Sequence, residues 1–466
     1  MPIFATRYPK AHAVFTMNAT KANRFPQRGR RICGPLLLAT TLVLGPRPSV
    51  RAQSYIYEQL YAFAGDTNGY GPAGALIQGA DGYLYGTCAE GGQPTTNCGA
   101  CGYGTVFKTT TEGALTTLAW FNGTNNGRYP FGGMILATDG NFYGTSDYGI
   151  FRTTPTGTLT GRGGGTVGDP IQGSDGYLYY ADGDTIFRSS LDGLAGMQWS
   201  APGTPSGGLF QASDGNFYGL TYNGGAYGLG TAYKLTPSGV LSTLVSFGPI
   251  SNAPIRPYGK LLQASDGNLY GVADTADGVV FRLTLTGALT NLAWFGVGEA
   301  YGGTPNGGLI EANDGNFYGT TAYGGGPPYY FSMGTVFKMT PQGKITTLVS
   351  FTGTGQGGPY PGYAPEAALV QGSDGNLYGT CAYGGTYGNG NIFRIIMPGP
   401  KLDSFRAGQQ LVISWRTNYT GFQLQSSSAL GGGNWSDCTN SLSTIGGQFF
   451  VTNSISGGAQ FFRLKK

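Results

Sequence analysis

The residues that could do chemistry in this chain are mainly carboxylates and tyrosines, because its 466 residues include a single histidine, His12. His12 lies in an N-terminal segment that we expect to be removed, which excludes a Ser-His-Asp triad, a histidine base and a histidine metal site from the mature chain. Two closely spaced acid pairs remain, Asp182 with Asp184 and Asp274 with Asp277. Such pairs could bind Ca²⁺ or act as general acid and base, and the alternative is that they are solvated loop carboxylates.

Tyrosine is the second candidate group, because its flat ring and polar hydroxyl suit sugar rings or a protein surface. Tyr222, Tyr323 and Tyr383 belong to a recurring segment rich in Tyr and Gly, so we expect them to pack between repeats. The tyrosines outside that segment are the predicted ligand-binding residues. They are Tyr70, Tyr129, Tyr148, Tyr258, Tyr301, Tyr330, Tyr360 and Tyr363.

These candidates lie between copies of one motif, of which Ser213 to Gly219 (Ser-Asp-Gly-Asn-Phe-Tyr-Gly) is typical. The copies are 36 to 60 residues apart, a spacing found in propellers and solenoids. An apolar run precedes each Asp-Gly and an aromatic run follows it, which predicts a β-hairpin in which the Asp forms the turn and is not a ligand. The Asp residues of the seven copies are Asp81, Asp139, Asp175, Asp214, Asp266, Asp314 and Asp374.

Each repeat continues with two further runs that lack a helical period. The third run ends in an aromatic residue and a base, as in Phe337-Lys338, and the fourth follows a turn such as Thr236 to Gly239. Four short strands per repeat, here named a to d, describe a propeller blade. We expect the base of strand c to pair with a turn Asp and to form a latch between neighbouring blades.

The seventh repeat lacks its fourth strand, because the chain reaches Met397-Pro398-Gly399-Pro400 directly after the third. A suitable run, Glu58 to Phe63, precedes the first hairpin. An N-terminal strand that completes the last blade would leave no open sheet edge. The sequence therefore predicts an all-β fold, a seven-bladed β-propeller over residues 53–397 closed by an N-terminal strand.

The connections of such a blade divide between two faces. The a–b and c–d turns share one face, the constant face, where the sequence varies little. The b–c and d–a connections share the other, the variable face, which carries the length variation and the candidate residues above. Binding residues are common on variable loops held by a rigid scaffold, so we expect function on the variable face.

Residues 1–52 are typical of a signal peptide, because arginines precede the apolar stretch 35–45 and Val50-Arg51-Ala52 offers a cleavage site. Either Met1 or Met17 could be the initiator. The apolar stretch is too short to span a bilayer, so we expect export to the extracellular space or cell surface and no membrane span in the mature chain. Removing the segment leaves 18 basic and 23 acidic residues, a net charge of −5, which argues against nucleic-acid binding.

The cysteines left after export favour a disulfide over a metal site. Cys98 and Cys101 could form one, or Cys88 could pair with either of them. A lone CxxC with no nearby histidine is weak support for zinc. Cys88 and Cys381 occupy equivalent positions in repeats that would be neighbours in a closed ring. We expect no metal and no cofactor, with Ca²⁺ left open by the acid pairs.

The repeat pattern ends before Lys401. Pro398 to Pro400 forms a linker, and the alternating runs of 401–466 predict a small β-sandwich, a sorting or attachment module or a spacer.

The motifs Ser-Asp-Gly-Asn-Leu-Tyr-Gly-Thr, Gly-Thr-Val-Phe-Lys-Met-Thr-Pro-Gln-Gly and Ile-Thr-Thr-Leu-Val-Ser-Phe resemble the GloVer tandem repeats of exported bacterial proteins, the "choice-of-anchor" group. The resemblance covers about residues 57 to 397. It implies an extracellular or surface-associated propeller and brings no catalytic residues. We expect a monomeric scaffold that binds a glycan or surface protein. A carbohydrate-active enzyme, a hydrolase or lyase using carboxylates and Tyr, is the alternative, and a purely structural protein without a concave pocket is a third.

Overall fold

The structure is a computed structural model in which every regular element of the described residues is a β-strand. The leader, 1–52, lies outside the described residues. No described helix is long and apolar enough to cross a membrane. The described residues are 55–72, 74–93, 102–124, 126–162, 168–193, 196–248, 254–274, 278–295, 303, 305–325, 333–353, 359–400, 402–416, 422–428, 434–454 and 460–465.

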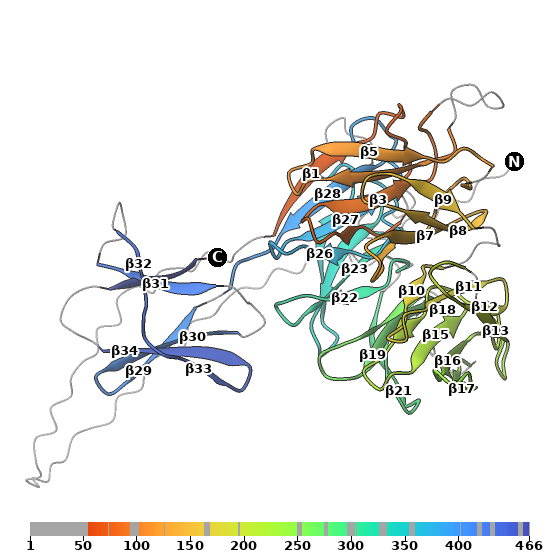
Figure 1. Cartoon of the computed structure of the whole chain (residues 1–466). Coiled ribbons are helices and arrows are strands. Elements are labelled where there is room, and N and C mark those ends of the chain that lie inside the picture. Colours follow the sequence, from red (N-terminus) through yellow and green to blue (C-terminus); the bar gives the residue numbers. More distant parts are fainter. Residues whose placement is uncertain are drawn as a thin grey trace, which may run out of the picture. The chain divides into compact units, whose positions relative to one another are not determined.

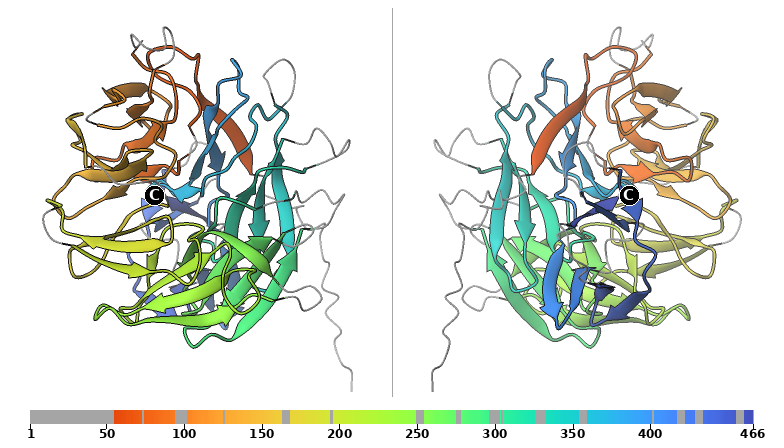
Figure 2. Two further views of the ribbon diagram at one scale, coloured as in Figure 1. Left: turned by 90° about the vertical axis from the view of Figure 1, so that its right-hand side faces the viewer. Right: turned by 90° about the vertical axis from the view of Figure 1, so that its left-hand side faces the viewer.

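Each sequence repeat forms one four-stranded antiparallel sheet, and the described part of 56–396 contains seven such sheets. Figure 1 labels the strands, and Figure 2 shows the sheets following one another around a common axis in a propeller-like arrangement. The first three sheets contain β2 (Ile77–Gln78), β3 (Leu84–Cys88), β4 (Thr105–Thr109) and β5 (Leu115–Trp120); β6 (Ile135–Leu136), β7 (Phe142–Ser146), β8 (Gly149–Thr153) and β9 (Leu159–Gly161); and β10 (Ile171–Gln172), β11 (Leu178–Asp182), β12 (Thr185–Ser189) and β13 (Gly196–Ser200). The next three contain β14 (Phe210–Gln211), β15 (Phe217–Thr221), β16 (Thr231–Leu235) and β17 (Leu241–Ser246); β18 (Ile255–Gln263), β19 (Leu269–Asp274), β20 (Val279–Leu283) and β21 (Leu289–Trp294); and β22 (Leu309–Glu311), β23 (Phe317–Thr321), β24 (Thr335–Met339) and β25 (Ile345–Ser350). The last contains β26 (Val370–Gln371), β27 (Leu377–Cys381), β28 (Asn391–Ile396) and β1 (Ile56–Ala62).

The core lies between neighbouring sheets and is largely aromatic. The second strand of a sheet is buried along its length, as in β3 and β7, because it faces a sheet on each side. Its central glycine makes room for the aromatic ring of strand c: a Cβ on Gly86 would lie 2.5 Å from Phe107 Cζ. Tyr85 stacks on Phe142 of the next sheet, with ring centroids 4.2 Å apart. Such contacts bury large apolar areas between sheets.

The Asp-Gly turns are built as the sequence predicts. In all seven repeats the Asp Oδ1 accepts a hydrogen bond from the backbone N–H two residues later. In all seven the Asp Oδ2 also accepts one from the hydroxyl of a buried tyrosine four residues later, at 2.6–2.8 Å. Both carboxylate oxygens are thus satisfied within the turn, so these Asp residues are turn formers.

The predicted latch, a strand-c base paired with an acid of a neighbouring repeat, is observed among the described residues at the closing junction, whereas two other bases pair within their own repeat. The base of strand c lies opposite this tyrosine in the same sheet, as Arg188 lies opposite Tyr179. Arg188 donates to Asp175 of its own repeat at 3.0 Å, and Lys338 pairs with Asp314 of its own repeat at 3.3 Å. These two ion pairs lie within a sheet, whereas Arg394 of the last repeat also pairs with Glu112 of the first repeat at 3.0 Å, which is an ion pair between sheets at the closing junction.

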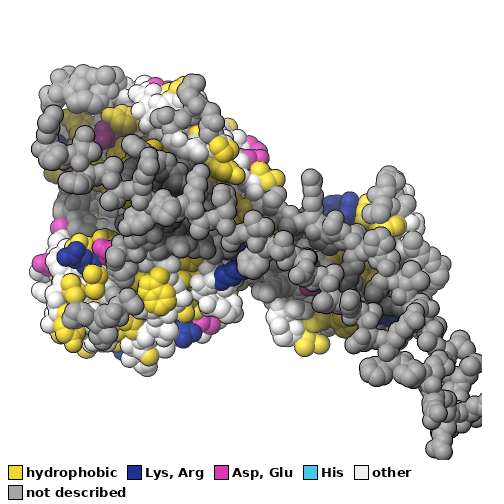
Figure 3. Space-filling model, turned by 180° about the vertical axis from the view of Figure 1, so that it is seen from behind, with side chains coloured by type: hydrophobic (Ala, Val, Ile, Leu, Met, Phe, Trp, Pro, Cys, Tyr) yellow, Lys and Arg dark blue, Asp and Glu magenta, His cyan; other side chains and the backbone are white. Residues whose placement is uncertain are grey.

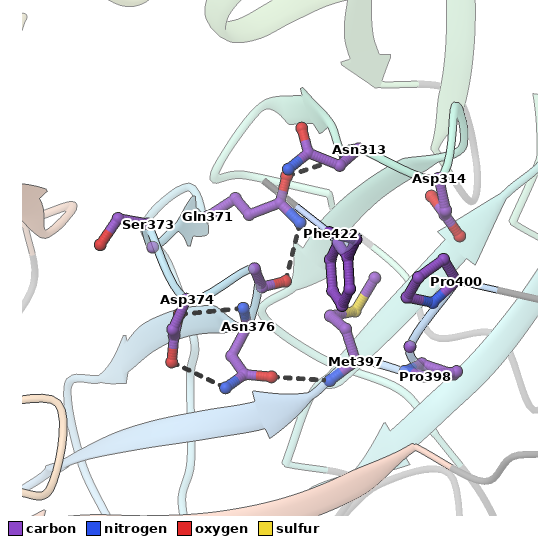
Figure 4. A pocket seen from close by; sticks show the side chains of 13 residues that line it. Asn313, Asp314, Gln371, Ser373, Asp374, Asn376, Met397, Pro398, Pro400 and Phe422 are labelled. Atoms are coloured by element: carbon purple, nitrogen blue, oxygen red, sulfur yellow. Dashed lines mark hydrogen bonds between the residues drawn. The ribbon is translucent and has the colours of Figure 1, made fainter. Parts of the chain in front are cut away.

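A glutamine or glutamate of strand a also links neighbouring sheets. Gln371 Oε1 accepts the backbone N–H of Asn313 in the preceding repeat at 2.9 Å, while its Nε2 donates to Gly375 O of its own turn (Figure 4). Equivalent bonds of 2.6–2.9 Å occur at six of the seven junctions among the described residues. At the remaining junction Leu136 occupies the position, and its side chain cannot accept this bond.

The last sheet is closed by the N-terminal strand. β1 pairs antiparallel with β28, as the sequence predicts. Pro72 packs on Gly390 of the last repeat just as Pro130 packs on Gly104, since a Cβ on either glycine would lie 2.6 or 2.7 Å from the proline Cδ. The junction between the last and first repeats thus repeats the geometry of the internal ones.

The C-terminal residues form two further sheets that share one core. The core residues include Ile413, Trp415, Leu424 and Val451, which come from both sheets. One sheet contains β29 (Asp403–Ala407), β30 (Gln410–Arg416), β34 (Gln448–Ser454) and β33 (Leu442–Ile445), and the other β32 (Ser436–Asp437), β31 (Gln423–Ser427) and β35 (Phe461–Lys465).

Candidate functional site

A cavity of about 220 Å³ lies where the inner strands of the seven sheets begin, on the variable face. Every repeat contributes to its wall, so it lies at the common axis seen in Figure 2. Most wall residues are Gly or Ala, and the other side chains are Phe131, Asp169, Lys260, Asn306 and Glu366.

The small residues are required by close approach of neighbouring chains. A Cβ on Gly74 would lie 2.4 Å from Gly132 O, and a Cβ on Gly207 would lie 2.3 Å from Gly259 O. Such distances are far below van der Waals contact, so a larger residue at these positions would force the strands apart.

At one position of the repeat, here called the ring position, two repeats do not have a small residue. The residue immediately before the first apolar residue of strand a, or its equivalent, is Gly or Ala in five repeats and charged in the other two. The seven residues are Ala75, Gly133, Asp169, Gly208, Lys260, Gly308 and Ala368. A change confined to single repeats indicates a local role, because the scaffold itself needs only a small residue there.

Asp169 has a partner within the scaffold. Its Oδ1 accepts the backbone N–H of Gly133 in the preceding repeat at 2.6 Å. This charge-assisted bond holds the carboxylate against the cavity wall.

Lys260 has no hydrogen bond or ion pair to any residue that the structure describes. Its side chain is partly buried among glycines at the cavity wall. Desolvation lowers the pKa of Lys260, and the negative charge of Asp169 acts in the opposite direction. The ammonium is therefore close enough to sense Asp169 and too far away to bond to it.

Asn306 and Glu366 complete the polar part of the wall. Asn306 Oδ1 is buried and has no hydrogen-bond partner among the described residues. Burial raises the pKa of Glu366. These two residues occupy one equivalent position in neighbouring repeats, together with Phe131, Ser206 and Tyr258.

The backbone at the rim is strained in three repeats. Tyr129, Arg256 and Ala364 have φ angles of 51°, 46° and 52°, which non-glycine residues rarely adopt. All three precede a proline and lie two residues before Phe131, Tyr258 and Glu366, respectively. Each such residue costs roughly 1–2 kcal/mol, and strain of this kind concentrates at functional sites.

Several predicted tyrosines lie on the rim in aromatic groups. Tyr129 contacts Tyr103 and Phe131, with ring centroids 6.1 and 6.3 Å away. Tyr258 contacts Tyr222 at 5.6 Å. Burial, and then the charge of Asp274, raises the pKa of Tyr258 to about 12.

The rings of Tyr363 and Tyr383 are in contact, with centroids 5.8 Å apart, and the backbones of these two residues are hydrogen-bonded to each other. Tyr383 and Tyr323 are 54% and 52% exposed. The prediction that these two consensus tyrosines pack between repeats is therefore wrong, because the loops turn their rings outward. Both belong with the rim candidates.

The other predicted tyrosines have different environments. Tyr148 is exposed, and Tyr360 packs edge-on against Tyr57. Tyr70 donates its hydroxyl to Glu90 at 2.7 Å, which together with burial raises the pKa of Tyr70 to about 12. Tyr301 and Tyr330 lie outside the described residues.

The acid pairs are only partly described. Asp182 and Asp184 flank the b–c turn of the third repeat, and Asp184 accepts the hydroxyl of Thr204 at 2.7 Å. Asp274 ends β19, whereas Asp277 lies outside the described residues. Over the described ranges, no group of three or more His, Cys, Asp or Glu could hold a metal ion.

The structure also bears on the disulfide alternatives. Cys88 and Cys381 are buried free thiols, so neither the Cys88–Cys381 pairing nor a Cys88 link to the CxxC segment is formed. Desolvation raises the pKa of both thiols. Cys98 and Cys101 lie outside the described residues.

Charged residues are sparse on the face seen in Figure 3. Among the coloured residues, acidic and basic side chains lie singly or beside one another, and no broad patch of one sign is visible.

The residues that sequence reasoning did not select are Lys260 and Asn306 at the cavity, together with the roles of Asp169 and Glu366. A position-by-position comparison of the repeats could have selected Asp169 and Lys260, because the other repeats have Gly or Ala at the same position.

Comparisons with known proteins agree with the repeat pattern. The family model described as the Gloeobacter/Verrucomicrobia repeat matches residues 154–393. A search of curated proteins found no match.

One solved structure shares the fold at low sequence identity, and others have lower similarity scores. The extracellular domain of a protein described as a hybrid two-component system from B. thetaiotaomicron has a TM-score of 0.51 and 11% identity, over 81% of this chain and 47% of that one. Another such domain from B. thetaiotaomicron has a TM-score of 0.49 and 9% identity, over 88% and 55%. A gluconolactonase from Xanthomonas campestris has a TM-score of 0.41 and 13% identity, over 73% and 89%. The chain thus spans about half the length of the first two structures. Because the family model covers more than half of the sequence, the protein belongs to the Gloeobacter/Verrucomicrobia repeat family, as its motifs predict.

Proposed function

We propose that the protein is an exported, seven-bladed β-propeller that binds a glycan or a surface protein through its variable face, around the axial cavity. The observation that supports this proposal is the difference between the turn Asp residues and the cavity wall. On the constant face, both oxygens of each turn Asp are hydrogen-bonded in all seven repeats. On the variable face, Lys260 and Asn306 have polar atoms without a partner among the described residues.

An unsatisfied buried polar group costs stability, typically about 1–3 kcal/mol. Such a group is therefore retained most readily where a ligand satisfies it. The rim adds exposed rings, including Phe131, Tyr323 and Tyr383, each more than half exposed. Rigid aromatic surfaces around a small polar cavity suit a sugar ring, which has apolar and hydroxylated faces. A purely structural protein, by contrast, would need no such cavity.

Two further features support export. The N-terminal 52 residues have the features of a signal peptide. The B. thetaiotaomicron structure with the same fold is itself an extracellular domain. We propose that the C-terminal residues, 401–466, form a β-sandwich that attaches or sorts the exported propeller.

The test is a glycan-array screen of the purified protein with and without Ca²⁺, because the acid pairs leave a Ca²⁺ contribution open. We expect a hit whose signal falls at least several-fold in the Tyr363→Ala/Tyr383→Ala double variant. Val240→Ala, an equally exposed apolar residue on the constant face, is the control. A silent array would redirect the search to protein partners, and a signal that tracks Val240 instead of the tyrosines would contradict the choice of face.

A carbohydrate-active enzyme is the second candidate, and the cavity itself favours it. Asp169 and Glu366 share the cavity wall, where Asp169 accepts a backbone N–H and burial raises the pKa of Glu366. Two carboxyl groups in unlike environments are a frequent arrangement of general acid and base in glycoside hydrolysis. A reducing-sugar assay on array hits, with Glu366→Gln as the inactive variant, tests it. Binding without sugar release in the unaltered protein would leave the binding function alone.

A further inference from the structure

We infer that the axial cavity receives a single acidic sugar residue, with Lys260 binding the sugar carboxylate and Glu366 accepting a hydrogen bond from a sugar hydroxyl. This inference rests on the proposed glycan-binding function and names the class of glycan.

Lys260 is the basic residue of the described cavity wall, and no described residue forms a hydrogen bond or ion pair with its ammonium. Asp169 is the nearest acid for which an electrostatic effect is resolved, yet it is held by Gly133 N–H and makes no ion pair with Lys260. Asn306 and Glu366 also lie in the wall but form no hydrogen bond or ion pair with Lys260, and most other wall residues are Gly or Ala, whose side chains offer no acceptor. A partly buried ammonium without a partner is costly, and a bound anion would restore a charge-assisted hydrogen bond.

Repeat symmetry shows that this lysine is not needed by the fold. The equivalent residue is Gly or Ala in five repeats, so the strand can begin without any side chain there. Lys260 is also a one-repeat feature, whereas the bases of strand c recur in all seven repeats. A single cation on the axis selects one anionic group, and not an extended polyanion.

The other wall residues complement the rest of a sugar ring. The Glu366 carboxylate is an acceptor that would take a hydroxyl donor, and it comes from the second repeat after that of Lys260. Phe131, from the second repeat, is 55% exposed and offers its ring to the apolar face of the sugar. The cavity thus combines one cation, the carboxylates of Asp169 and Glu366, and one aromatic ring.

Size and charge narrow the choice further. A volume of about 220 Å³ is below the roughly 300–1,000 Å³ typical of drug-sized ligands, so the cavity suits one sugar ring at the end of a chain. Phosphate recognition usually employs arginine or several converging N–H donors, and the described wall has one lysine beside two carboxylates. A singly charged carboxylate therefore fits better than a phosphate.

Isothermal titration of the full chain with methyl glucuronoside, methyl galacturonoside and methyl glucoside tests the inference. At least one uronoside should bind about 10- to 100-fold more tightly than the glucoside, the effect of one charge-assisted hydrogen bond. Lys260→Met should remove this preference, and Lys260→Arg should keep part of it. Lys344→Met, which removes an exposed lysine of the constant face, should change nothing.

The comparison of uronosides with glucoside on the unaltered protein needs no variant, so a folding defect in Lys260→Met cannot obscure the result. Equal affinities for charged and neutral sugars, or a preference that survives Lys260→Met, would overturn the inference. In that case the proposed function still stands if array signals depend on Tyr363 and Tyr383. The absence of any sugar binding, acidic or neutral, in both titration and array would overturn the inference together with the glycan part of the proposed function, and would leave only a protein partner.

Discussion

Replacing Gly390 by alanine tests whether the last and first repeats close on each other as tightly as the structure shows. Gly390 precedes β28, and Pro72 of the first repeat packs directly on it. A Cβ there would lie 2.6 Å from both Cys381 O and Pro72 Cδ, and 2.8 Å from Ala382 O. Two of these three atoms belong to the backbone, which cannot rotate away.

The expected cost has two parts. The φ angle of Gly390 is 94°, where an alanine is strained by roughly 1–2 kcal/mol. Forcing a methyl group into a filled space adds roughly 1–3 kcal/mol. The sum, about 2–5 kcal/mol, is a large share of the roughly 5–15 kcal/mol by which folded proteins are stable.

The variant Gly82→Ala measures the cost of the positive φ angle alone. Gly82 lies in an Asp-Gly turn with a φ of 82°, and a Cβ there would meet nothing within 4 Å. We expect Gly82→Ala to lower the free energy of unfolding in urea by about 1–2 kcal/mol, and Gly390→Ala to lower it by a further 1–3 kcal/mol. The double variant Gly390→Ala/Pro72→Ala should recover part of that difference, because it removes the Pro72 ring atoms that the methyl group meets.

Equal losses for the two glycines would refute the reasoning, since the steric part would then be absent. A Pro72→Ala change that is additive with Gly390→Ala would show that the two residues do not touch, and hence that the ring does not close through this contact.

Other expectations concern the repeated networks and the thiols. Burial and the Asp bond raise the pKa of Tyr143, Tyr179 and Tyr270 to about 12, against about 10 when unfolded, so their contribution is complete below pH 10 and is lost as pH rises toward 12. The free energy of unfolding, measured in urea, should therefore fall above pH 10 by up to about 1.4 kcal/mol per pH unit for each tyrosine. Tyr143→Phe should make this fall less steep. A free energy of unfolding that does not change with pH would contradict the buried Asp–Tyr bonds. Gln78→Leu removes the hydrogen bonds to Ser373 N–H and Gly82 O at the closing junction, and should lower the free energy of unfolding in urea by about 1 kcal/mol. An unchanged free energy of unfolding would show that this junction does not need the glutamine, just as the junction at Leu136 lacks one. Cys88 and Cys381 should resist thiol reagents in the native protein, because both are buried and their pKa values are raised, and peptide mass spectrometry should find them labelled only after unfolding; labelling of either in the native state would contradict their burial.

The sequence determines the repeat and its turns because these depend on short-range geometry. The Asp of each Asp-Gly turn bonds to groups two and four residues away, so the same short motif forms the same hairpin wherever it occurs. Alternation along a strand fixes which side chains face the neighbouring sheet. The missing fourth strand of the last repeat and the strand-like run at 58–63 likewise reveal β1, because a sheet edge needs a partner.

Contacts between repeats are a different matter, because they depend on how closely the sheets pack. The sequence suggested bases as the latch, and a base links two repeats at the closing junction, where Arg394 pairs with Glu112. Six junctions, this one included, use the strand-a glutamine or glutamate, whose reach to the preceding turn is set by the packing of the two sheets. The outward direction of Tyr323 and Tyr383 is decided by loop conformation in the same way.

The candidate site is the clearest case. Asp169, Lys260, Asn306 and Glu366 are far apart in the chain and belong to no shared motif. They meet because the inner strands of all seven sheets begin around one axis, where neighbouring chains approach so closely that adjacent positions such as Gly74 and Gly207 have no room for a side chain. The sequence by itself determines the blades and the face that varies, whereas the convergence of the sheets decides which few side chains share the cavity.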